Sequence, residues 1–475
     1  MARRAPAGLP LLAARGRALG RHRDRCVLRL GPAGGPRLRR RRRGGLADPG
    51  GLRPAGRASA PRRPDRSVAV SRALDVLPGP WLLRSTSPGL EAHAELRGSL
   101  PQLDAASLLA LVEASGLRGR GGAGFPFATK LRATVSAPGR RRHVVVNLSE
   151  GEPASAKDLA LTLHQPHLVL DGASLVAHAL GTREVHVVTA AEHPEAQEAL
   201  LAALAERRKE RRDGRRRWRL HEASPRFVGG EASAVTELID GRPNLPVTSW
   251  RPTALAGVDG KPTVLSNGET YAQLAALVLG GAPVPGTPAE PGTRLLSIAG
   301  PTGTTRVVEV AHGTPWRTVL STTELAAPVL LGGYHGTWAP AGALEQLSVS
   351  HADLTAAGLG LGAGVVLPLA PGTCPLRATA GVTRYLARQS AGRCGPCHQG
   401  LPALATALDA FLAGGSLERV ERLRSLVVGR GACAHPDGTA RLVGSALAAF
   451  PDEVAAHSDG QCRALRPALT TVGVR

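Results

Sequence analysis

The residues best suited to chemistry lie in two places, a glycine-rich segment and a group of cysteines near the C-terminus. Residues 117–130 read LRGRGGAGFPFATK, with four glycines ahead of a single lysine, Lys130. Glycine lets the backbone turn sharply and approach a ligand, and successive N–H groups in such a turn suit phosphate. Gly119, Gly121 and Gly124 also satisfy G-x-G-x-x-G, a weak pattern in a chain with 58 glycines. From spacing alone, a phosphate cradle and an ordinary glycine-rich loop are equally open.

The cysteines indicate a metal or redox centre. They fall at positions 26, 374, 394, 397, 433 and 462. Cys394-Gly-Pro-Cys397 is a C-x-x-C motif between two expected helices, and Cys433 lies in a loop that can fold back on it. No secretory signal is evident, so a metal or redox centre outranks a structural disulfide. An iron–sulfur cluster and a Cys3His zinc site completed by His435 both fit this spacing. A thioredoxin-like dithiol is disfavoured because the motif lies among helices.

Parallel strands are predicted to position the polar candidates of the first region. His143–Asn147 (HVVVN) reads as a buried parallel strand, and Glu184–Ala190 reads as a second. The first is followed at once by Ser149, Glu150 and Glu152, where open α/β sheets usually bind ligands. Periodicity predicts helices over 103–116 and 194–206. The basic run 207–219 is interpreted as a solvated helix end and loop rather than a docking patch for an acidic partner.

The second half changes character twice. A Pro/Gly-rich linker is expected over 281–291. Short strand candidates then predict a small mixed β domain, at 295–298, 307–310 and 365–367. Helices return beyond it, over 382–389, 401–412, 417–428 and 440–456, and this number suits a compact bundle.

Length and charge bound the function class. A chain of 475 residues predicts about three domains. The net charge of +22 is mostly local, because residues 1–70 hold 19 arginines and three aspartates. We expect that arm to be disordered, and it lacks aromatic residues for base stacking, so specific nucleic-acid binding is not expected. An alternative is that the true start lies downstream, near Val68 or Val70. No apolar run is long enough for a membrane span.

Taken in order, these segments resemble one family, the flavoprotein F subunit of NADH-quinone oxidoreductase (complex I) and its relatives in NAD-linked hydrogenases and formate dehydrogenases. LRGRGGAGFP at 117–126 is similar, residue for residue, to that family's flavin loop. Further similar segments are Asn147 with 150–153 (EGEP), 157–158 (KD), 166–167 (PH), 230–231 (GE), 262–263 (PT), Asn267 with 269–270 (ET), Cys394-x-x-Cys397 and Cys433.

The resemblance implies an α/β fold with a Rossmann-like domain for FMN, a ubiquitin-like β-grasp (SLBB) domain and a helical bundle that carries a 4Fe-4S cluster. The expected ranges are 1–70 for the arm, 71–285, 292–372 and 373–475. The implied activity is that of an NADH dehydrogenase-like oxidoreductase. Electrons pass from NADH as substrate through FMN to the cluster, and then to a ferredoxin-like or membrane reductase partner. The chain is expected in the cytoplasm, and at the inner face of the membrane only through that partner. The alternative is a degenerate subunit that keeps only its partner-binding role.

The resemblance also assigns residues. Glu150 and Glu152 are the expected catalytic carboxylates, which would orient NADH. The expected FMN-binding residues are Gly119, Arg120, Gly121, Gly122, Gly124, Phe125, Lys130, Asn147, Ser149, Glu150, Gly230, Glu231, Ser266 and Asn267. The expected cluster ligands are Cys394, Cys397, Cys433 and Cys462, with His398 and His435 as the other candidates for the fourth position.

Four positions depart from the family pattern. Ser149, Ala232 and Ser266 stand where the family has polar or acidic residues, and Ala391 stands in place of a cluster cysteine. The segment that the family uses near NADH is replaced by LPVTSWRP at 245–252. These losses affect the nicotinamide side more than the flavin side.

Overall fold

The computed structural model describes residues 73–85, 87–139, 141–280, 283–300 and 303–464. The chain separates into two units, Met1–Ala69 and Val70–Arg475, and every described residue belongs to the second. The arginine-rich arm expected over 1–70 therefore lies outside the described residues.

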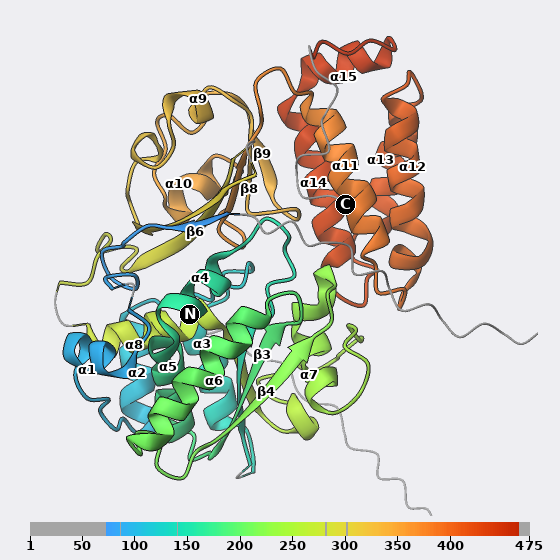
Figure 1. Ribbon diagram of the computed structural model, residues 1–475. Helices are drawn as coiled ribbons and strands as arrows, with labels where there is room; N and C mark the ends of the chain where they lie inside the picture. The colour runs from blue at the N-terminus through green and yellow to red at the C-terminus, as the bar shows by residue number, and fades with distance from the viewer. Residues whose placement is uncertain (1–72, 86, 140, 281–282, 301–302, 465–475) are drawn as a thin grey trace, which may run out of the picture. The chain divides into compact units, whose positions relative to one another are not determined.

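A four-stranded parallel sheet forms the first layer of the fold (Figure 1). Its strands run in the order β4-β3-β2-β5. They are β2 (His143–Leu148), β3 (Glu184–Ala190), β4 (Arg217–Ala223) and β5 (Thr263–Asn267). The predictions of β2 and β3 are confirmed. The interpretation of 207–219 as helix end and loop is confirmed for 207–216 and corrected for 217–219, because Arg217 and Arg219 lie on β4, an edge strand with alternating polar residues.

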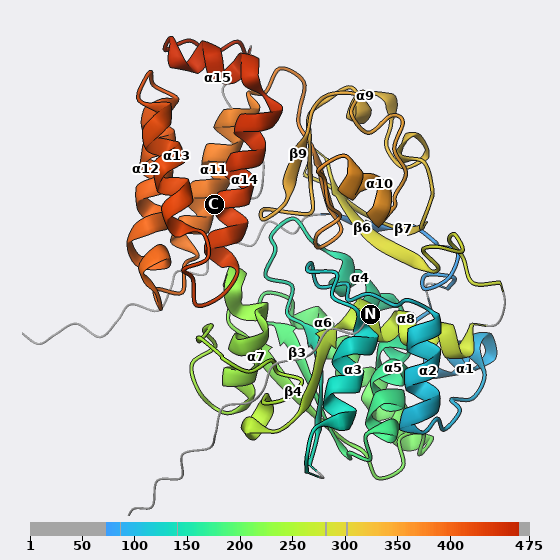
Figure 2. The ribbon, with the colours of Figure 1, turned by 180° about the vertical axis from the view of Figure 1, so that it is seen from behind.

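Helices cover this sheet, and alternation along the strands decides which side chains they meet. Val144, Val146 and Leu148 pack into the largest core, whereas Val145 packs on the other face. The helices of this part are α1 (Leu90–Arg97), α2 (Ala105–Ala114), α3 (Phe127–Ser136), α4 (Lys157–His164), α5 (Pro166–Ala179), α6 (Pro194–Lys209), α7 (Ala232–Ile239) and α8 (Gly268–Leu279). α6 is in front in Figure 1, and α2 and α3 are in front in the reverse view of Figure 2.

A second sheet is mixed and has six strands in the order β1-β7-β6-β10-β8-β9. The strands are β1 (Leu74–Val76), β6 (Thr293–Ala299), β7 (Thr305–Ala311), β8 (Val329–Leu331), β9 (Thr337–Ala339) and β10 (Val365–Pro368), with the short helices α9 (Thr322–Leu325) and α10 (His351–Ala356) between them. The predictions of strands at 295–298, 307–310 and 365–367 are confirmed. β1 pairs in parallel with β7, so the first described strand belongs to this sheet.

One buried carboxylate fixes the segment after β1. Glu309 on β7 accepts hydrogen bonds from the backbone N–H groups of Trp81, Leu82 and Leu83 at 2.8 to 3.1 Å, and from Thr293 Oγ1 at 2.6 Å. A buried carboxylate is tolerated only when its oxygens are satisfied in this way. The glutamate thus ties the N-terminal segment to the mixed sheet.

The C-terminal part is a helical bundle. Its helices are α11 (Pro375–Arg388), α12 (Leu401–Phe411), α13 (Leu417–Val427), α14 (His435–Ala449) and α15 (Pro451–Ser458). The expected helix over 440–456 is divided, because Pro451 lacks the N–H that a continuing helix needs. α11 also begins seven residues earlier than predicted, with Cys374 as its N-cap. No helix within the described ranges is long and apolar enough to cross a membrane.

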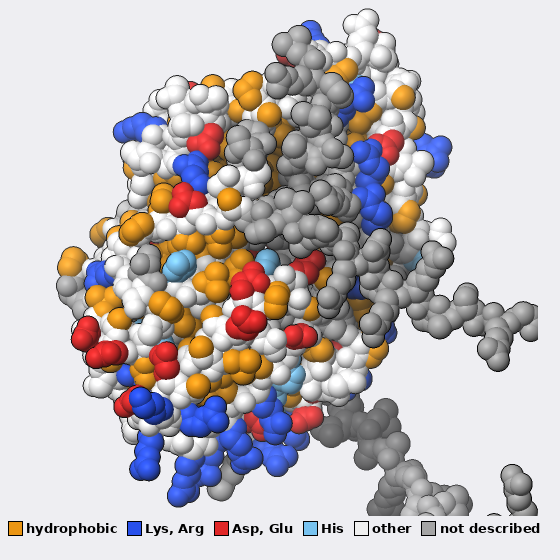
Figure 3. Space-filling model, in the orientation of Figure 1, with side chains coloured by type: hydrophobic (Ala, Val, Ile, Leu, Met, Phe, Trp, Pro, Cys, Tyr) orange, Lys and Arg blue, Asp and Glu red, His pale blue; other side chains and the backbone are white. Residues whose placement is uncertain are grey.

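The basic run 207–219, which begins in the last turn of α6, is partly held by ion pairs. Arg207 Nη1 lies 2.7 Å from Asp171 Oδ1, and Arg212 Nη2 lies 2.8 Å from Asp171 Oδ2, so these two arginines bind α5. Arg211 and Arg215 are exposed. Figure 3 shows Lys and Arg side chains gathered at the lower end of the region that α6 and β4 occupy in Figure 1.

Candidate functional site

Two asparagines mark the carboxyl edge of the parallel sheet. Asn147 on β2 is the register partner of Asn267 on β5. The Asn147 amide donates to the carbonyl of Gly230 at 2.8 Å, and the Asn267 amide donates to Asp158 Oδ2 at 2.6 Å. Asn267 also caps α8, with its oxygen accepting from Glu269 N at 3.1 Å. The structure therefore brings both predicted asparagines to one edge and fixes their orientation.

The segment after β2 lies directly against the segment after β4. A Cβ on Gly230 would come within 2.6 Å of the Ser149 carbonyl, and a Cβ on Gly151 within 2.6 Å of the Phe227 carbonyl. Any larger residue at either position would force the two segments apart. Beside this contact lies a pocket lined by Ser149, Glu150, Gly151, Ala190, Glu192, Ala223, Ser224, Arg226 and Gly230. Three predicted residues, Ser149, Glu150 and Gly230, thus share one pocket at the carboxyl ends of β2, β3 and β4.

The glycine-rich loop is closed by backbone hydrogen bonds. Gly119 N donates to the Phe125 carbonyl at 2.8 Å, and Phe127 N donates to the Leu117 carbonyl at 2.9 Å. Gly122 and Gly124 have φ of 117° and 60°, a conformation that favours glycine. A Cβ on Gly121 would lie 3.4 Å from Cβ of Asn267, so the loop passes directly over the end of β5. Phe125 is 50% exposed.

The two basic side chains of this region have different surroundings. Arg120 is buried, and its guanidinium donates to the Thr293 carbonyl at 3.0 Å and contacts His312 Nε2 at 3.1 Å. Its side chain therefore joins the loop to the mixed sheet. Lys130 on α3 donates to the Leu265 carbonyl at 2.5 Å, and burial lowers the pKa of its amine to about 8. A buried amine whose pKa is lowered in this way gains from a nearby anion.

Three predicted carboxylates already have backbone partners. Glu150 accepts from the N–H groups of Asp158 and Leu159 at 3.1 Å, which are in the first turn of α4. Glu231 is the N-cap of α7 and accepts from Ser233 N at 2.8 Å. Glu152 accepts from Tyr334 N at 2.8 Å, and burial raises its pKa to about 7. Glu150 and Glu231 therefore stabilise helix ends, and Glu152 joins this edge to the loop before β9.

The two serines that replace larger polar residues, Ser149 and Ser266, differ in how they are exposed at the site. Ser149 Oγ bonds Asn147 Oδ1, and Ser266 is buried at 4% exposure in β5. Ser149 remains at the pocket, whereas Ser266 is covered.

Sequence reasoning missed a buried charge network next to the asparagines. Lys157 Nζ lies 2.9 Å from Asp158 Oδ1, 2.9 Å from Asn267 Oδ1 and 3.2 Å from Glu269 Oε2. Burying a charge costs free energy, and pairing the Lys157 amine with the two carboxylates offsets that cost. The signal was present in the Lys-Asp pair at 157–158, which the family resemblance had picked out without a role.

Three of the predicted thiols lie at one end of the bundle, which we call the loop end. Cys394, Cys397 and Cys433 interact electrostatically with one another. Burial raises the pKa of Cys397, and it raises that of Cys433 to about 11. A raised pKa favours the protonated thiol, so a metal bound by Cys397 and Cys433 must displace their protons.

Cys462 lies at the opposite end, which corrects its assignment as the fourth ligand. Its thiol belongs to a group with Cys374, Glu453 and His457, whose ligand atoms all lie within 4.8 Å of one another. Cys374 precedes α11, and the Cys394 loop follows it. Fourteen helical residues separate the two ends by about 21 Å. We call the second group the α15 end.

The other candidates for the fourth position differ in availability. His435 is buried, with Nδ1 3.1 Å from His335 Nε2 and Nε2 2.9 Å from the Leu386 carbonyl. Both of its ring nitrogens are engaged within the protein. His398 is exposed and directly follows Cys397. Of the three groups considered, His398 alone is both near the loop-end thiols and accessible.

The loop end is also joined to the pocket. Phe227 N donates to Gln389 Oε1 at 3.1 Å, just beyond α11. The Phe227 ring lies 5.6 Å from that of His435 and stacks at 6.5 Å on Tyr334. Phe227 begins the turn that ends at Gly230, so one short segment contacts both the pocket and the bundle.

Comparison with known proteins agrees with this division. The family model described as Nuo51 FMN-binding domain matches residues 112–276, and the one described as NADH-ubiquinone oxidoreductase-F iron-sulfur binding region matches residues 377–457. The F subunit of NADH-quinone oxidoreductase from Mycobacterium tuberculosis is 30% identical over 380 residues, covering 74% of this chain and 85% of the relative. The second F subunit of the same enzyme from Rhizobium meliloti is 29% identical over 409 residues, covering 81% and 96%.

Solved structures give the same result. The chain superposes on NAD+-reducing NiFe-hydrogenase in the H2-reduced state with a TM-score of 0.70 and 26% identity, over 82% of this chain and 68% of that one. The region that matches the FMN-binding model thus precedes the region that matches the iron–sulfur model along this chain. The chain therefore belongs to the family of NADH-quinone oxidoreductase F subunits, which are FMN- and iron–sulfur-binding oxidoreductases.

Proposed function

We propose that this chain oxidises NADH at an FMN held over the carboxyl edge of the parallel sheet and delivers single electrons to a 4Fe-4S cluster at the loop end. The observation that carries the proposal is Phe227–Gly230, the segment that borders the pocket and contacts the bundle beside the loop-end thiols. FMN accepts a hydride and releases electrons one at a time, which is chemistry that no side chain supplies. The protein's part is to bind, orient and insulate.

The surroundings of the glycine-rich loop fit FMN. Lys130 offers a buried amine whose described hydrogen-bond partner is a carbonyl, so it can neutralise a phosphate. The close approach of Gly121 to Asn267 and of Gly230 to Ser149 leaves backbone rather than side chains facing the edge. Phe125 supplies an exposed ring for stacking. In this proposal Arg120 positions the loop, since its N–H donates to Thr270 Oγ1 at 3.0 Å and its guanidinium is held by Thr293 and His312.

The loop end fits a cluster better than a single zinc ion. In the described residues, Cys394, Cys397 and Cys433 do not form a group whose ligand atoms all lie within 4.8 Å of one another. A single ion needs such convergence, whereas a cluster of four irons spreads its ligands. We assign Cys394, Cys397 and Cys433 as ligands and His398 as the fourth.

We further propose that the six-stranded sheet is the β-grasp domain that the family resemblance implied. Its mixed pairing, with β10 parallel to β6 and antiparallel to β8, supports this assignment. The proposed domain limits remain 71–285, 292–372 and 373–475. The strand β1 falls in the first range but pairs with β7 in the six-stranded sheet of the second.

The partner is proposed to be a redox protein of the kind found in the named relatives. Those relatives are subunits of NADH-quinone oxidoreductase or belong to NAD+-reducing hydrogenase. An electron acceptor has to approach the cluster, and the loop end carries exposed residues such as His398.

Anaerobic stopped-flow mixing with NADH tests the proposal. Flavin absorbance should bleach on mixing, and the iron–sulfur absorbance should fall with it or after it. Protein that holds flavin and iron yet shows no bleaching with NADH would overturn the assignment of NADH as donor. Lys130→Met should lower FMN affinity, and Arg132→Met, on the same helix but exposed, is its matched control.

The second candidate is a degenerate subunit that binds partners without oxidising NADH. It is favoured by Ser149 and by the use of Glu150 and Glu231 as helix caps, which leaves fewer free carboxylates at the edge. The same mixing experiment separates the two functions, because a degenerate subunit with bound FMN would be reduced by dithionite but not by NADH.

A further inference from the structure

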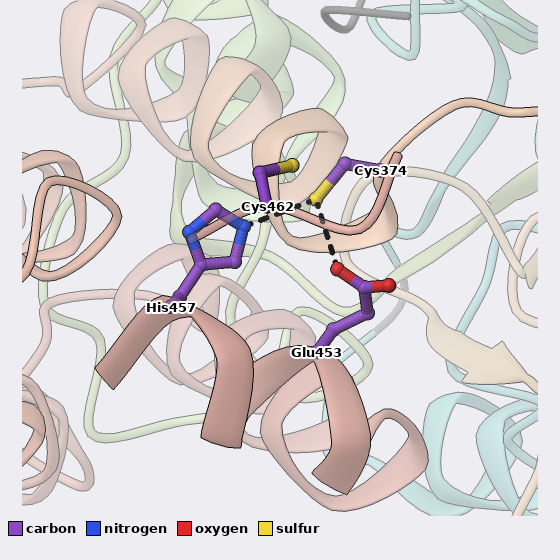
Figure 4. A group of neighbouring side chains, drawn as sticks. All are labelled: Cys374, Glu453, His457 and Cys462. Atoms are coloured by element: carbon purple, nitrogen blue, oxygen red, sulfur yellow. Dashed lines mark hydrogen bonds between the residues drawn. The ribbon is translucent and has the colours of Figure 1, made fainter. Parts of the chain in front are cut away.

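The α15 end of the bundle brings together four side chains of metal-binding type. Cys374 precedes α11, Glu453 and His457 lie on α15, and Cys462 follows α15 (Figure 4). Glu453 and His457 are four residues apart, so they lie on one face of the helix. Figure 4 shows all four directed toward a common point. They come from segments about eighty residues apart, and the fold alone makes them neighbours.

We propose that these four residues bind a zinc ion, separate from the iron–sulfur cluster. Cys374 Sγ lies 3.4 Å from His457 Nε2 and 3.9 Å from Glu453 Oε2, and all the ligand atoms lie within 4.8 Å of one another. In a zinc tetrahedron with Zn–S of about 2.3 Å and Zn–N of about 2.0 Å, neighbouring ligand atoms are about 3.5 to 3.8 Å apart. The ligand set Cys2HisGlu fills four positions, so the site is closed and structural.

The imidazole is already set in the form that a metal needs. Nδ1 of His457 lies 3.2 Å from the Leu412 carbonyl, an acceptor, so Nδ1 carries the proton. Nε2 is then unprotonated and directs its lone pair toward Cys374. A backbone carbonyl that fixes the tautomer in this way is the usual support of a metal-binding histidine.

The charges also balance. Two thiolates and one carboxylate bring three negative charges, and the zinc ion brings two positive ones. The side chain of Arg377 hydrogen-bonds Cys462 and supplies the remaining positive charge. The Arg377 N–H also donates to Cys374 Sγ at 3.4 Å. A neutral assembly with satisfied sulfur atoms can lie at the edge of an apolar core, as this one does.

The composition of the group argues against the alternatives. An iron–sulfur cluster is normally held by four cysteines, and this group has two. The ligand atoms converge as a single ion requires, which the loop-end thiols do not. The matched iron–sulfur region, 377–457, includes neither Cys374 nor Cys462.

The direct test is zinc and iron analysis of the full-length protein, with zinc-edge X-ray absorption to count ligands. We expect one zinc per chain with two sulfur and two nitrogen or oxygen neighbours, in addition to the cluster iron. Cys462→Ser should lose most of the zinc and keep the iron. Cys397→Ser is the matched control at the loop end, and it should keep the zinc and lose the iron.

Three results would overturn the proposal. One is protein that holds its iron but binds no stoichiometric zinc, either as isolated or after zinc addition and dialysis. Another is zinc with three sulfur neighbours that disappears in Cys397→Ser. A third is a disulfide joining Cys374 and Cys462, identified by mass spectrometry of the unreduced peptides. If Cys462→Ser fails to fold, Glu453→Gln serves instead, and it should release zinc to a chelator at lower concentration than wild type does.

Discussion

The two ends of the helical bundle both carry cysteines, but the cysteines have different neighbours at each end. At the loop end, Cys394 and Cys433 lie on loops and Cys397 lies in the helical turn Pro396–Gly400, beside a segment that borders the pocket. At the α15 end, Cys374 and Cys462 meet a histidine and a carboxylate and close on themselves. There, Glu453 and His457 lie on one helix, Cys374 is the N-cap of α11 and Cys462 follows α15. Under the two proposals, the position of a cysteine in the bundle, rather than its spacing along the chain, decides whether it serves the cluster or the zinc site.

The largest expected effect comes from removing a loop-end thiol. Cys397→Ser should abolish the iron–sulfur cluster, because it removes one of the three assigned thiolates and a cluster is normally held by four ligands. Iron content and the electron paramagnetic resonance signal of the reduced protein measure this. Flavin content should be unchanged, since Cys397 is not among the residues lining the pocket. Retention of iron in this variant would mean that the cluster is held elsewhere.

The next effect is expected at the α15 end and should appear as stability. His457→Ala removes a fully buried ring and leaves the Leu412 carbonyl and the Cys374 thiol without their partner. The loss should be about 3 kcal/mol in the free energy of unfolding of the bundle. Chemical denaturation measures it, with Ser458→Ala on the same helix as the control. Equal stability of the two variants would show that this end contributes nothing to the fold.

Some elements of the fold and site could be predicted from the sequence, and others could not. The strands β2 and β3 were predictable, because a short β-branched run such as HVVVN is typical of a buried strand in a parallel sheet. β4 was not, since an edge strand with alternating arginines resembles a solvated loop. Cys462 was assigned to the wrong end because spacing along the chain carries no information about which end of α11 a distant residue reaches. Glu150 and Glu231 were recognised as part of the site, but their use as helix caps depends on where α4 and α7 begin.

A third prediction concerns pH and the contact between the edge of the parallel sheet and the loop before β9, where Glu152 accepts from Tyr334 N. Burial raises the pKa of Glu152 to about 7, from an ordinary value near 4.5. The folded protein therefore binds a proton more tightly than the unfolded chain does. Stability should fall as pH rises from about 4.5 to about 7 and level off above it, by about 3 kcal/mol in all.

Glu152→Gln isolates this contribution, because the amide resembles the protonated acid and does not titrate. Unfolding free energies at pH 5 and pH 8 should differ less in Glu152→Gln than in wild type. Glu198→Gln changes an exposed carboxylate on α6 and should behave as wild type does. An equal pH dependence in Glu152→Gln and wild type would refute the assignment.

The smallest effect is expected from one methyl group at the contact between pocket and bundle. In Gly230→Ala the new Cβ would lie 2.6 Å from the Ser149 carbonyl, so the segment from Phe227 must move away from the sheet edge. We expect FMN affinity to fall about tenfold, equivalent to about 1.4 kcal/mol, as measured by fluorescence titration. Gly360→Ala is the control, because its Cβ would meet no atom within 4 Å and its φ is not left-handed.

Electron transfer from flavin to cluster should also slow in Gly230→Ala, since the same segment contacts Gln389 and His435. Zinc content should not change, because the α15 end lies about 21 Å away along α11. An unchanged FMN affinity would show that flavin binding does not depend on this contact. The loop end of the bundle would then have no demonstrated link to the flavin site.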